Sequence, residues 1–397
     1  MRNILIYINF LVFGLIVITS CTEEESITPE MSFTRVYTDE SFGNNFFAVD
    51  VVQTADSGYL VLGEYENENV EYRFSPYVLK VDALGAVEWD LKLDDPYQKP
   101  VKGLQVSDTA VAFFCMSNAN QTTYRMSVNL DARSVTEIEN IGSVTFPLAS
   151  APLSSGGFVL LGFDINDSKS VVYQRGEGGT WTAEFLNIED ADDIVVPHLN
   201  RTGPQLPFFT GTFDGGIYFN GLSNFGFGMR FLDNGGNDLG GSLSGFRYST
   251  GLSAAVHISG NNFALARYDD NQNYLMPLQQ VDVGADETTN RLGGLEIPQM
   301  KDKAVTEVQV VDILGQPTVL YGTSTRDNRI MLTGYDANTG LLLGTKYFGN
   351  GNPYDMVAAR STGDGGLILV SNTYVTGRFP RIALFKISES QASDIIY

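Results

Sequence analysis

Cysteine and histidine are scarce in this chain of 397 residues. It has two cysteines, Cys21 and Cys115, and two histidines, His198 and His257. Since Cys21 ends an apolar leader, no internal disulfide can form, and we expect Cys115, in the apolar run Val111–Met116, to be a small buried residue. Stability must therefore come from apolar burial, for which 43% hydrophobic and 12% aromatic residues suffice.

Sequence motifs for common chemistry are also missing. The chain has no G-x-S-x-G elbow, no Walker loop, no H-E-x-x-H motif and no cysteine nucleophile with a nearby histidine. Paired carboxylates for glycoside hydrolysis stay open, because 47 acidic residues offer many pairs and their separation is a three-dimensional property.

Cations are few. The chain has 25 Lys and Arg against 47 Asp and Glu, a net charge of −22. Such a surface repels phosphate backbones and anionic headgroups, so we expect no nucleic-acid partner and no binding to a membrane surface through charge. It also resists non-specific association.

The N-terminus has the form of a secretory signal. Arg2 precedes the apolar run Ile4–Ile18, which is about 15 residues long and so too short for the roughly 20 that span a bilayer. The end of the run, Ile18-Thr19-Ser20-Cys21, resembles a bacterial lipobox. That resemblance implies a lipoprotein signal peptide over 1–20, cleavage before Cys21 and acylation of Cys21.

An acidic cluster, Glu23, Glu24 and Glu25, follows Cys21. It belongs to a tether over 21–31 that is solvated in either interpretation. The cluster also resembles the surface-export signal of Bacteroidetes lipoproteins. That resemblance implies an outer-membrane protein, held by its N-terminal lipid and facing the cell exterior.

The remainder, 32–397, consists of repeats of a turn followed by an apolar strand. Forty-one glycines and short β-branched or aromatic runs, without strongly helix-forming windows, indicate an all-β chain. The seven repeat copies end at positions 63, 115, 162, 211, 267, 322 and 371. The fourth copy, Gln205–Gly211, competes with a similar pattern at Asp214–Ile217. The copies are spaced by roughly 50 residues, and repeats of about that length build one closed array, so we expect a single domain.

Further strands follow several copies. Tyr77–Asp82 leads into an Asp-x-x-Gly turn that suits a hairpin, and Val87–Leu93 follows it. The pattern D-G-G-Y-x-L-x-G, then K-x-D-x-x-G-x-x-x-W, resembles the β-propeller repeats of secreted bacterial proteins. The resemblance implies a seven-bladed propeller of four-stranded antiparallel blades and carries no catalytic residues with it. Phe33–Tyr37 matches Thr345–Gly349, so we expect it to complete the last blade and close the ring.

In a propeller, the first strand of each blade lines the channel. The fourth-to-first and second-to-third connections share one face, the loop face, where ligands usually dock. Aromatics are frequent in these connections, with Arg73, Lys99, Arg247, Arg326 and Arg378 among them. Tyr and Arg are enriched at interaction hot spots, although each could instead pack between blades. The binding candidates are Tyr65, Tyr72, Arg73, Phe74, Tyr97, Phe213, Phe225, Tyr268, Tyr274, Tyr354, Tyr374, Arg378 and Phe379. Phe213–Phe227 is expected to be the longest such loop, with Glu64–Ser75 next.

Two metal sites are conceivable. His198 and His257, expected in the first strands of units four and five, could bind a metal with Asp192 or Asp193, or simply be packed. The cluster Glu189, Asp190, Asp192 and Asp193 could hold Ca²⁺, but it lacks the spaced D-x-D-x-D-G loop, which favours a solvated acidic loop. No other cofactor is expected.

The leading hypothesis is a non-catalytic surface lipoprotein that binds a protein or a glycan. It would serve as an accessory to an outer-membrane transport or assembly complex. The alternative hypothesis is a polysaccharide-degrading lyase or glycosidase on a propeller scaffold. A third hypothesis is a structural spacer without a ligand.

Overall fold

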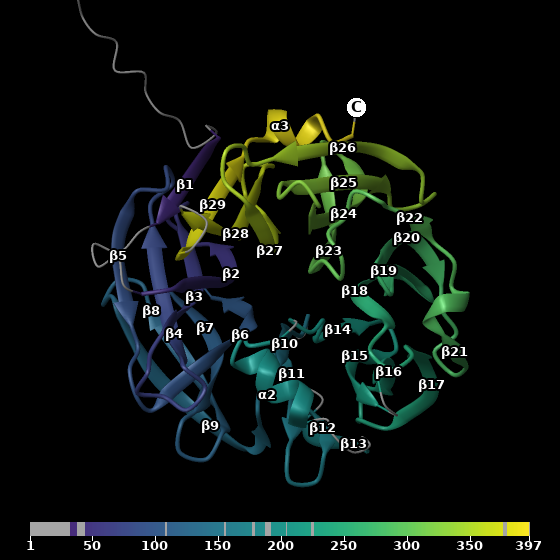
Figure 1. Cartoon of the computed structure of the whole chain (residues 1–397), viewed down its shortest axis with the longest axis horizontal. Helices are drawn as coiled ribbons and strands as arrows, with labels where there is room; N and C mark the ends of the chain where they lie inside the picture. Colours follow the sequence, from purple (N-terminus) through teal and green to yellow (C-terminus); the bar gives the residue numbers. More distant parts are fainter. Residues whose placement is uncertain are drawn as a thin grey trace, which may run out of the picture.

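The chain folds as a seven-bladed β-propeller around a central channel (Figure 1). The computed structural model describes residues 32–37, 44–107, 109–154, 156–176, 179–186, 192–203, 205–223, 226–375 and 379–396. The expected signal peptide, tether, Cys21 and Glu23–Glu25 lie outside these residues. Within the described part of the chain, no helix is long and apolar enough to cross a membrane.

The strands of the described residues form seven sheets, numbered here as blades in chain order from β2. Blade 1 consists of β2 (Phe46–Gln53), β3 (Tyr59–Glu66), β4 (Phe74–Val81) and β5 (Val87–Lys92). Blade 2 consists of β6 (Tyr97–Val106), β7 (Ala110–Ser117), β8 (Thr122–Asn129) and β9 (Ser134–Thr145). Blade 3 consists of β10 (Ala149–Pro152), β11 (Gly157–Asp164), β12 (Lys169–Gly176) and β13 (Gly179–Leu186).

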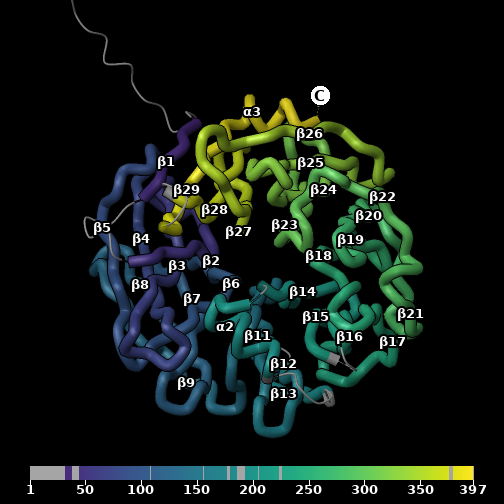
Figure 2. The backbone as a smooth tube through the Cα atoms, in the orientation of Figure 1, coloured from purple at the N-terminus to yellow at the C-terminus, as the bar shows by residue number. Residues whose placement is uncertain are grey.

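The other four blades continue around the ring (Figure 2). Blades 4 to 7 are β14 (Phe209–Phe213), β15 (Gly216–Ser223), β16 (Gly226–Asp233) and β17 (Asp238–Ser244); β18 (Thr250–Ser259), β19 (Asn262–Asp269), β20 (Gln272–Gln280) and β22 (Leu295–Glu296); β23 (Thr306–Ile313), β24 (Gln316–Ser324), β25 (Ile330–Asp336) and β26 (Leu342–Phe348); and β27 (Tyr354–Ser361), β28 (Leu367–Val375), β29 (Phe379–Ile387) and β1 (Phe33–Tyr37). In addition, β21 (Asp286–Thr288) pairs in parallel with β17. The helices are α2 (Asp192–Leu199), η2 (Thr289–Arg291) and α3 (Glu389–Ser393).

Burial explains the order of strands within a blade. The middle strands β3 and β4 are buried along nearly their whole length, whereas the outer strand β5 is mostly exposed. The apolar clusters lie between neighbouring blades; in one of them Val51 and Val61 of blade 1 join Val370 and Leu384 of blade 7. Cys115 is fully buried in such a cluster, as expected, and burial raises the pKa of its thiol.

The two halves of the repeat motif contact each other. Lys386, fully buried in the third strand of blade 7, lies 2.8 Å from the Asp364 carboxylate in the D-G-G turn. A Cβ atom on Gly366 would lie 2.3 Å from the Ile387 carbonyl oxygen and 2.4 Å from Lys386 Nζ, so the turn needs glycine there. Lys80 and Asp56 make the same pair in blade 1, at 2.8 Å.

The ring closes through its N-terminal strand, as predicted. β1 pairs antiparallel with β29 from Phe33 opposite Lys386 to Tyr37 opposite Ile382. The Tyr37 hydroxyl also donates to the Gly85 carbonyl of blade 1, 3.0 Å away. Two segments far apart in the sequence therefore share one blade (Figure 1).

The prediction for unit four needs correction. The second strand of blade 4 is β15, which begins at Gly216, so the pattern at Asp214–Ile217 is the repeat copy and Gln205–Gly211 is not. The loop expected over Phe213–Phe227 was wrong for the same reason, because most of it is β15. His198 lies in α2 rather than in a first strand, whereas His257 lies in the first strand β18, as expected.

Candidate functional site

A cavity of about 850 Å³ occupies the channel. First strands of all seven blades line it, mostly near the ends at which they begin, which is the loop face. Glu64, Tyr268 and Tyr374, near the loop-face ends of other strands, also line it, together with residues of α2 and the segment after it. We call this loop-face end of the cavity the mouth. The volume lies in the range of small-molecule binding pockets.

The cavity wall has a charged side and an apolar side. Blades 3, 4 and 5 contribute mainly small or apolar residues, such as Ala149, Phe209 and Ala254. Blades 1, 2, 6 and 7 contribute most of the ionisable side chains. The cationic residues lining the cavity are Lys99, Lys102, Arg201, Lys301, Lys303 and Arg360. The acidic ones are Glu64, Asp193, Asp302, Glu307 and Asp355.

This composition contrasts with that of the whole chain. Six of its 25 Lys and Arg line the cavity, but only five of its 47 Asp and Glu do. The cavity lining is thus close to charge balance within a strongly acidic protein. An anionic group would meet less repulsion here than elsewhere on the surface.

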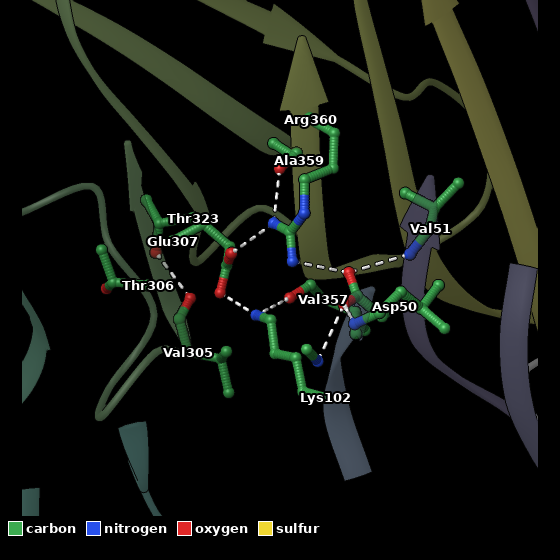
Figure 3. Close-up of polar contacts among 12 residues, drawn as sticks. Asp50, Val51, Lys102, Val305, Thr306, Glu307, Thr323, Val357, Ala359 and Arg360 are labelled. Carbon is green, nitrogen blue, oxygen red and sulfur yellow. Dashed lines mark hydrogen bonds and ion pairs between the residues drawn. The ribbon is translucent and has the colours of Figure 1, made fainter. Parts of the chain in front are cut away.

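Four charged side chains form a network at the cavity wall (Figure 3); Lys102, Glu307 and Arg360 line the cavity, and Asp50 lies buried behind them. Arg360 Nη2 lies 2.7 Å from Asp50 Oδ1, and Arg360 Nη1 lies 3.4 Å from Glu307 Oε2. Lys102 Nζ pairs with Glu307 and donates to the Val357 carbonyl at 2.9 Å. The network therefore joins the first strands of blades 1, 2, 6 and 7.

Asp50 is the fully buried member of this network. Burial alone would raise the pKa of its carboxyl group. The charges of Arg360 and Lys102, with N–H groups of Leu104 and Gly103 that each donate at 3.0 Å, outweigh burial and hold the pKa of Asp50 below its ordinary value. Because every charge in the network has a partner, its role is to tie blades together.

The mouth holds a second cluster with an excess of positive charge. Glu64 Oε2 lies 2.6 Å from Lys99 Nζ, and Glu64 Oε1 accepts from Arg201 Nε. Two rings support the cations: Lys99 lies over Phe74 at 4.7 Å and Arg201 over Phe47 at 4.3 Å. The Glu64 carboxylate thus forms ion pairs with both cations, Lys99 and Arg201.

The pKa values reflect this imbalance. Burial lowers the pKa of Lys99 to about 8, since the attraction of Glu64 is partly offset by repulsion from Arg201. Burial acts to raise the pKa of Glu64, but Arg201 and Lys99 outweigh it and lower that pKa. Glu64 is therefore ionised at neutral pH and remains bound between the two cations.

α2 brings Arg201 and His198 to the mouth. Val195 and Leu199 of α2 pack against Phe163 and Phe227 of blades 3 and 4, which anchors the helix beside the channel (Figure 1). His198 Nδ1 accepts from the Leu206 N–H at 3.0 Å. Burial and the charges of Lys99 and Arg201 lower the pKa of His198 to about 3. The imidazole is therefore neutral, with its proton on Nε2 as a donor.

Few of the predicted binding residues line this cavity. Tyr268 and Tyr374 do, and Phe74 lies beneath Lys99. Most of the others have partners elsewhere. Tyr65 donates a hydrogen bond to Asp94, Arg73 pairs with Glu66 at 2.6 Å, and the Tyr274 ring lies beneath Arg267. The remaining rings pack against another ring: Tyr72 on Phe146, Tyr97 on Tyr124, Phe213 on Phe231 and Tyr354 on Phe385. Phe379 is 38% exposed but does not line the cavity. Phe225 and Arg378 lie outside the described residues.

The predicted histidine metal site does not form. His257 Nε2 lies 2.9 Å from the Gly260 carbonyl, in the turn at the opposite end of the blades from α2. His198 and Asp193 line the cavity, but His257 does not. Among the described residues, no three His, Cys, Asp or Glu side chains gather as metal ligands. Glu189, Asp190 and the side chain of Asp192, which belong to the predicted Ca²⁺ cluster, lie outside the described part of the structure.

The sequence placed Lys99, Glu64 and Lys303 in expected loop-face segments, without singling out Lys303, and gave no sign of Arg201 or Ser253. Arg201 follows a helix that the repeat pattern does not contain, because α2 is an insertion between β13 and β14. Only the break in strand periodicity near His198 could have indicated it. Lys303 and Ser253 lack any distinguishing local pattern.

Comparison with known proteins identifies no family for this chain. No family model matches the chain, and no curated protein sequence matches it. Solved structures with a similar fold include the β-propeller domain of the Trilobed protease from Pyrococcus furiosus, with 10% identity, TM-score 0.48 and coverage of 87% of this chain and 98% of that one. An acylaminoacyl peptidase from Pyrococcus horikoshii has 10% identity and a TM-score of 0.47, with coverage of 89% of this chain and 53% of that one. A Trypanosoma rangeli sialidase has 8% identity and a TM-score of 0.46, with coverage of 88% of this chain and 55% of that one. This chain therefore spans about half of the peptidase and of the sialidase. Identities this low carry no conclusion about function.

Proposed function

We propose that this protein is a lipid-anchored outer-membrane protein, exposed at the cell surface, that binds a glycan or a protein through the mouth of its propeller channel. The lipid anchor and export rest on Cys21 and Glu23–Glu25 in the sequence. The binding role rests on one observation: a cavity of about 850 Å³ whose cations and aromatics converge at the loop face.

The engagement of the cavity's carboxylates favours binding over hydrolysis. Four of the five are ion-paired: Glu64 with Lys99 and Arg201, Glu307 with Lys102, Asp355 with Lys301, and Asp302 with Arg326. The fifth, Asp193, is exposed at the start of α2. A glycosidase needs a general acid whose pKa is raised, whereas ion pairing of Glu64 lowers its pKa.

The test uses the mature, lipidated protein purified from detergent-solubilised outer membranes. We expect it to retain a stoichiometric outer-membrane partner or to bind defined members of a glycan array. Incubation with those glycans should leave their chain length unchanged. Release of reducing ends or unsaturated sugars would establish the alternative, a polysaccharide-degrading enzyme. Recovery of neither partner nor glycan would contradict the proposal.

A further inference from the structure

The mouth offers more hydrogen-bond donors than its own acceptors satisfy. Arg201 uses Nε on Glu64 and Nη1 on Gln205, 3.4 Å away, and no partner of Nη2 is seen in the described residues. Lys99 has three N–H donors, of which Glu64 Oε2 takes one. His198 presents Nε2–H, because its Nδ1 accepts from Leu206. A ligand here must be rich in acceptors.

Ser253 supports the same conclusion from the apolar side. It lines the cavity and is 8% exposed, yet its hydroxyl has no hydrogen-bond partner among the described residues. Ser253 lies at the irregularity between Leu252 and Ala254 in β18, where the pairing with β19 shifts. Such bulges re-aim a side chain, and a buried hydroxyl without a partner is unfavourable.

Lys303 adds a cation without a carboxylate partner in the described part of the chain. Its Nζ donates to the Tyr248 carbonyl at 3.4 Å and lies 5.9 Å from the centre of the Tyr268 ring. The side chain is exposed and lines the cavity with both tyrosines. Lys303 therefore adds a positive charge to an aromatic wall.

The segment before β18 extends this wall outward. Phe246 is 64% exposed, and the Arg247 guanidinium lies 5.3 Å from its ring centre. Arg247 and Tyr248 both have positive φ, 46° and 59°, which is unusual for two consecutive residues that are not glycine. Hydrogen bonds from the N–H groups of Ser249 and Thr250 to the Phe246 carbonyl, at 2.9 and 3.3 Å, hold this conformation. Strain maintained in this way is common where a side chain must be presented.

These observations together select the ligand. Cations and a neutral imidazole donor suit one carboxylate, and flat aromatics suit the face of a sugar ring. The −22 net charge of the chain would repel a polyanion more strongly than a single acidic unit. We propose that the mouth binds the terminal acidic sugar of a glycan, with its carboxylate among Lys99, Arg201 and His198 and its ring against Tyr268 and Tyr374. This proposal rests on the binding function proposed above and specifies its ligand.

Calorimetric titration of the full-length protein with matched probes tests the proposal. Methyl β-D-glucuronide and methyl β-D-glucoside differ only in the carboxylate, and the peptide Ac-Gly-Glu-Gly-NH₂ carries a carboxylate without a sugar. We expect the glucuronide to bind about tenfold or more tightly than either of the others, because charge-assisted bonds to the carboxylate are strong. Equal binding of glucoside, tighter binding of the peptide, or no binding by any probe would overturn it.

Variants locate the carboxylate. Arg201→Gln should weaken glucuronide binding about tenfold or more, and Lys303→Gln, which alters an exposed side chain, should weaken it less. Arg175→Gln, which removes a guanidinium from an exposed pair with Glu139 on the outside of blade 3, is the matched control and should bind as wild type does. Melting curves establish that each variant is folded; if Arg201→Gln unfolds the protein, Arg201→Lys replaces it. Wild-type affinity in folded Arg201 and Lys303 variants would contradict the assignment.

The two proposals fail in different ways. Binding of neutral array glycans or of a membrane protein, without preference for the glucuronide, would leave the binding function standing and remove the acidic-sugar assignment. Absence of any glycan or partner would remove both.

Discussion

Lys99 Nζ lies 2.6 Å from Glu64 Oε2, and the two side chains are 8% and 1% exposed. The same carboxylate also receives Arg201, which the chain supplies from the segment after α2. Blade 1, blade 2 and an inserted helix thus meet at one buried charge. That junction determines both the shape of the mouth and its excess of positive charge.

Removal of the shared carboxylate should destabilise the fold. Glu64→Gln leaves Lys99 and Arg201 close together without a counter-charge, so we expect the free energy of unfolding to fall by about 3 kcal/mol. Urea unfolding followed by circular dichroism measures it. Glu66→Gln is the control, because Glu66 pairs with the half-exposed Arg73 and its loss should cost less than about 1 kcal/mol. Equal effects of the two substitutions would show that the buried junction contributes nothing special.

Asp50 should make stability depend on pH in acid. The pKa of Asp50 in the folded protein lies below its ordinary value of 3.8. At a pH between these two pKa values, the unfolded chain binds more protons than the folded protein does. The stabilisation is complete above the ordinary pKa and is lost as the pH falls through the folded-state pKa. Asp50→Asn should lower the free energy of unfolding by about 3–5 kcal/mol at pH 7 and flatten its slope below pH 4. Denaturant titrations at several pH values measure both, and an unchanged slope would contradict the assignment.

Deletion of residues 32–38 should lower the melting temperature sharply. It removes β1 and so exposes the edge of β29 and the partner side chains of Phe33 and Tyr37. Differential scanning calorimetry measures the effect. Deletion of residues 22–28, in the expected tether, is the control and should leave the melting temperature as it is. An unchanged curve for the first deletion would mean that ring closure contributes little.

Lipidation predicts where the protein is found in the cell. Cys21→Ala should remove it from the outer-membrane fraction and leave an unprocessed precursor, because the expected cleavage and acylation both depend on Cys21. Replacement of Glu23, Glu24 and Glu25 by Ala should keep the lipid but reduce digestion by protease added to intact cells. Fractionation and immunoblotting read out both variants. Processing and outer-membrane retention of Cys21→Ala would contradict the lipoprotein prediction.

The architecture could be predicted because it repeats. Each copy combines a turn with an apolar strand, and the Asp and Lys residues of the first and last copies make the same contact, Asp56 with Lys80 and Asp364 with Lys386. Phe33–Tyr37 was recognisable because it carries the pattern of a fourth strand. Local pattern failed where the repeat was interrupted, namely at α2 and at the start of blade 4.

The site could not be predicted in the same way. Its charged residues come from positions as distant as Glu64, Arg201 and Lys303, and each looks like an ordinary polar residue in its own segment. Aromatics in loops were a weak guide, since most, such as Tyr72 and Tyr354, pack between blades. Only closure of the ring, which is a property of the whole chain, brings the cations together.

The most direct test of the central claim is to obstruct the mouth. Val305 lines the cavity and is 42% exposed, whereas Val310, on β23, is 41% exposed and does not line it. Binding of the partner or glycan captured by the wild-type protein is then measured for Val305→Trp and Val310→Trp. We predict that Val305→Trp loses binding while Val310→Trp retains it at equal melting temperature. Retention by both variants, or equal loss in both, would place the ligand elsewhere and contradict the account.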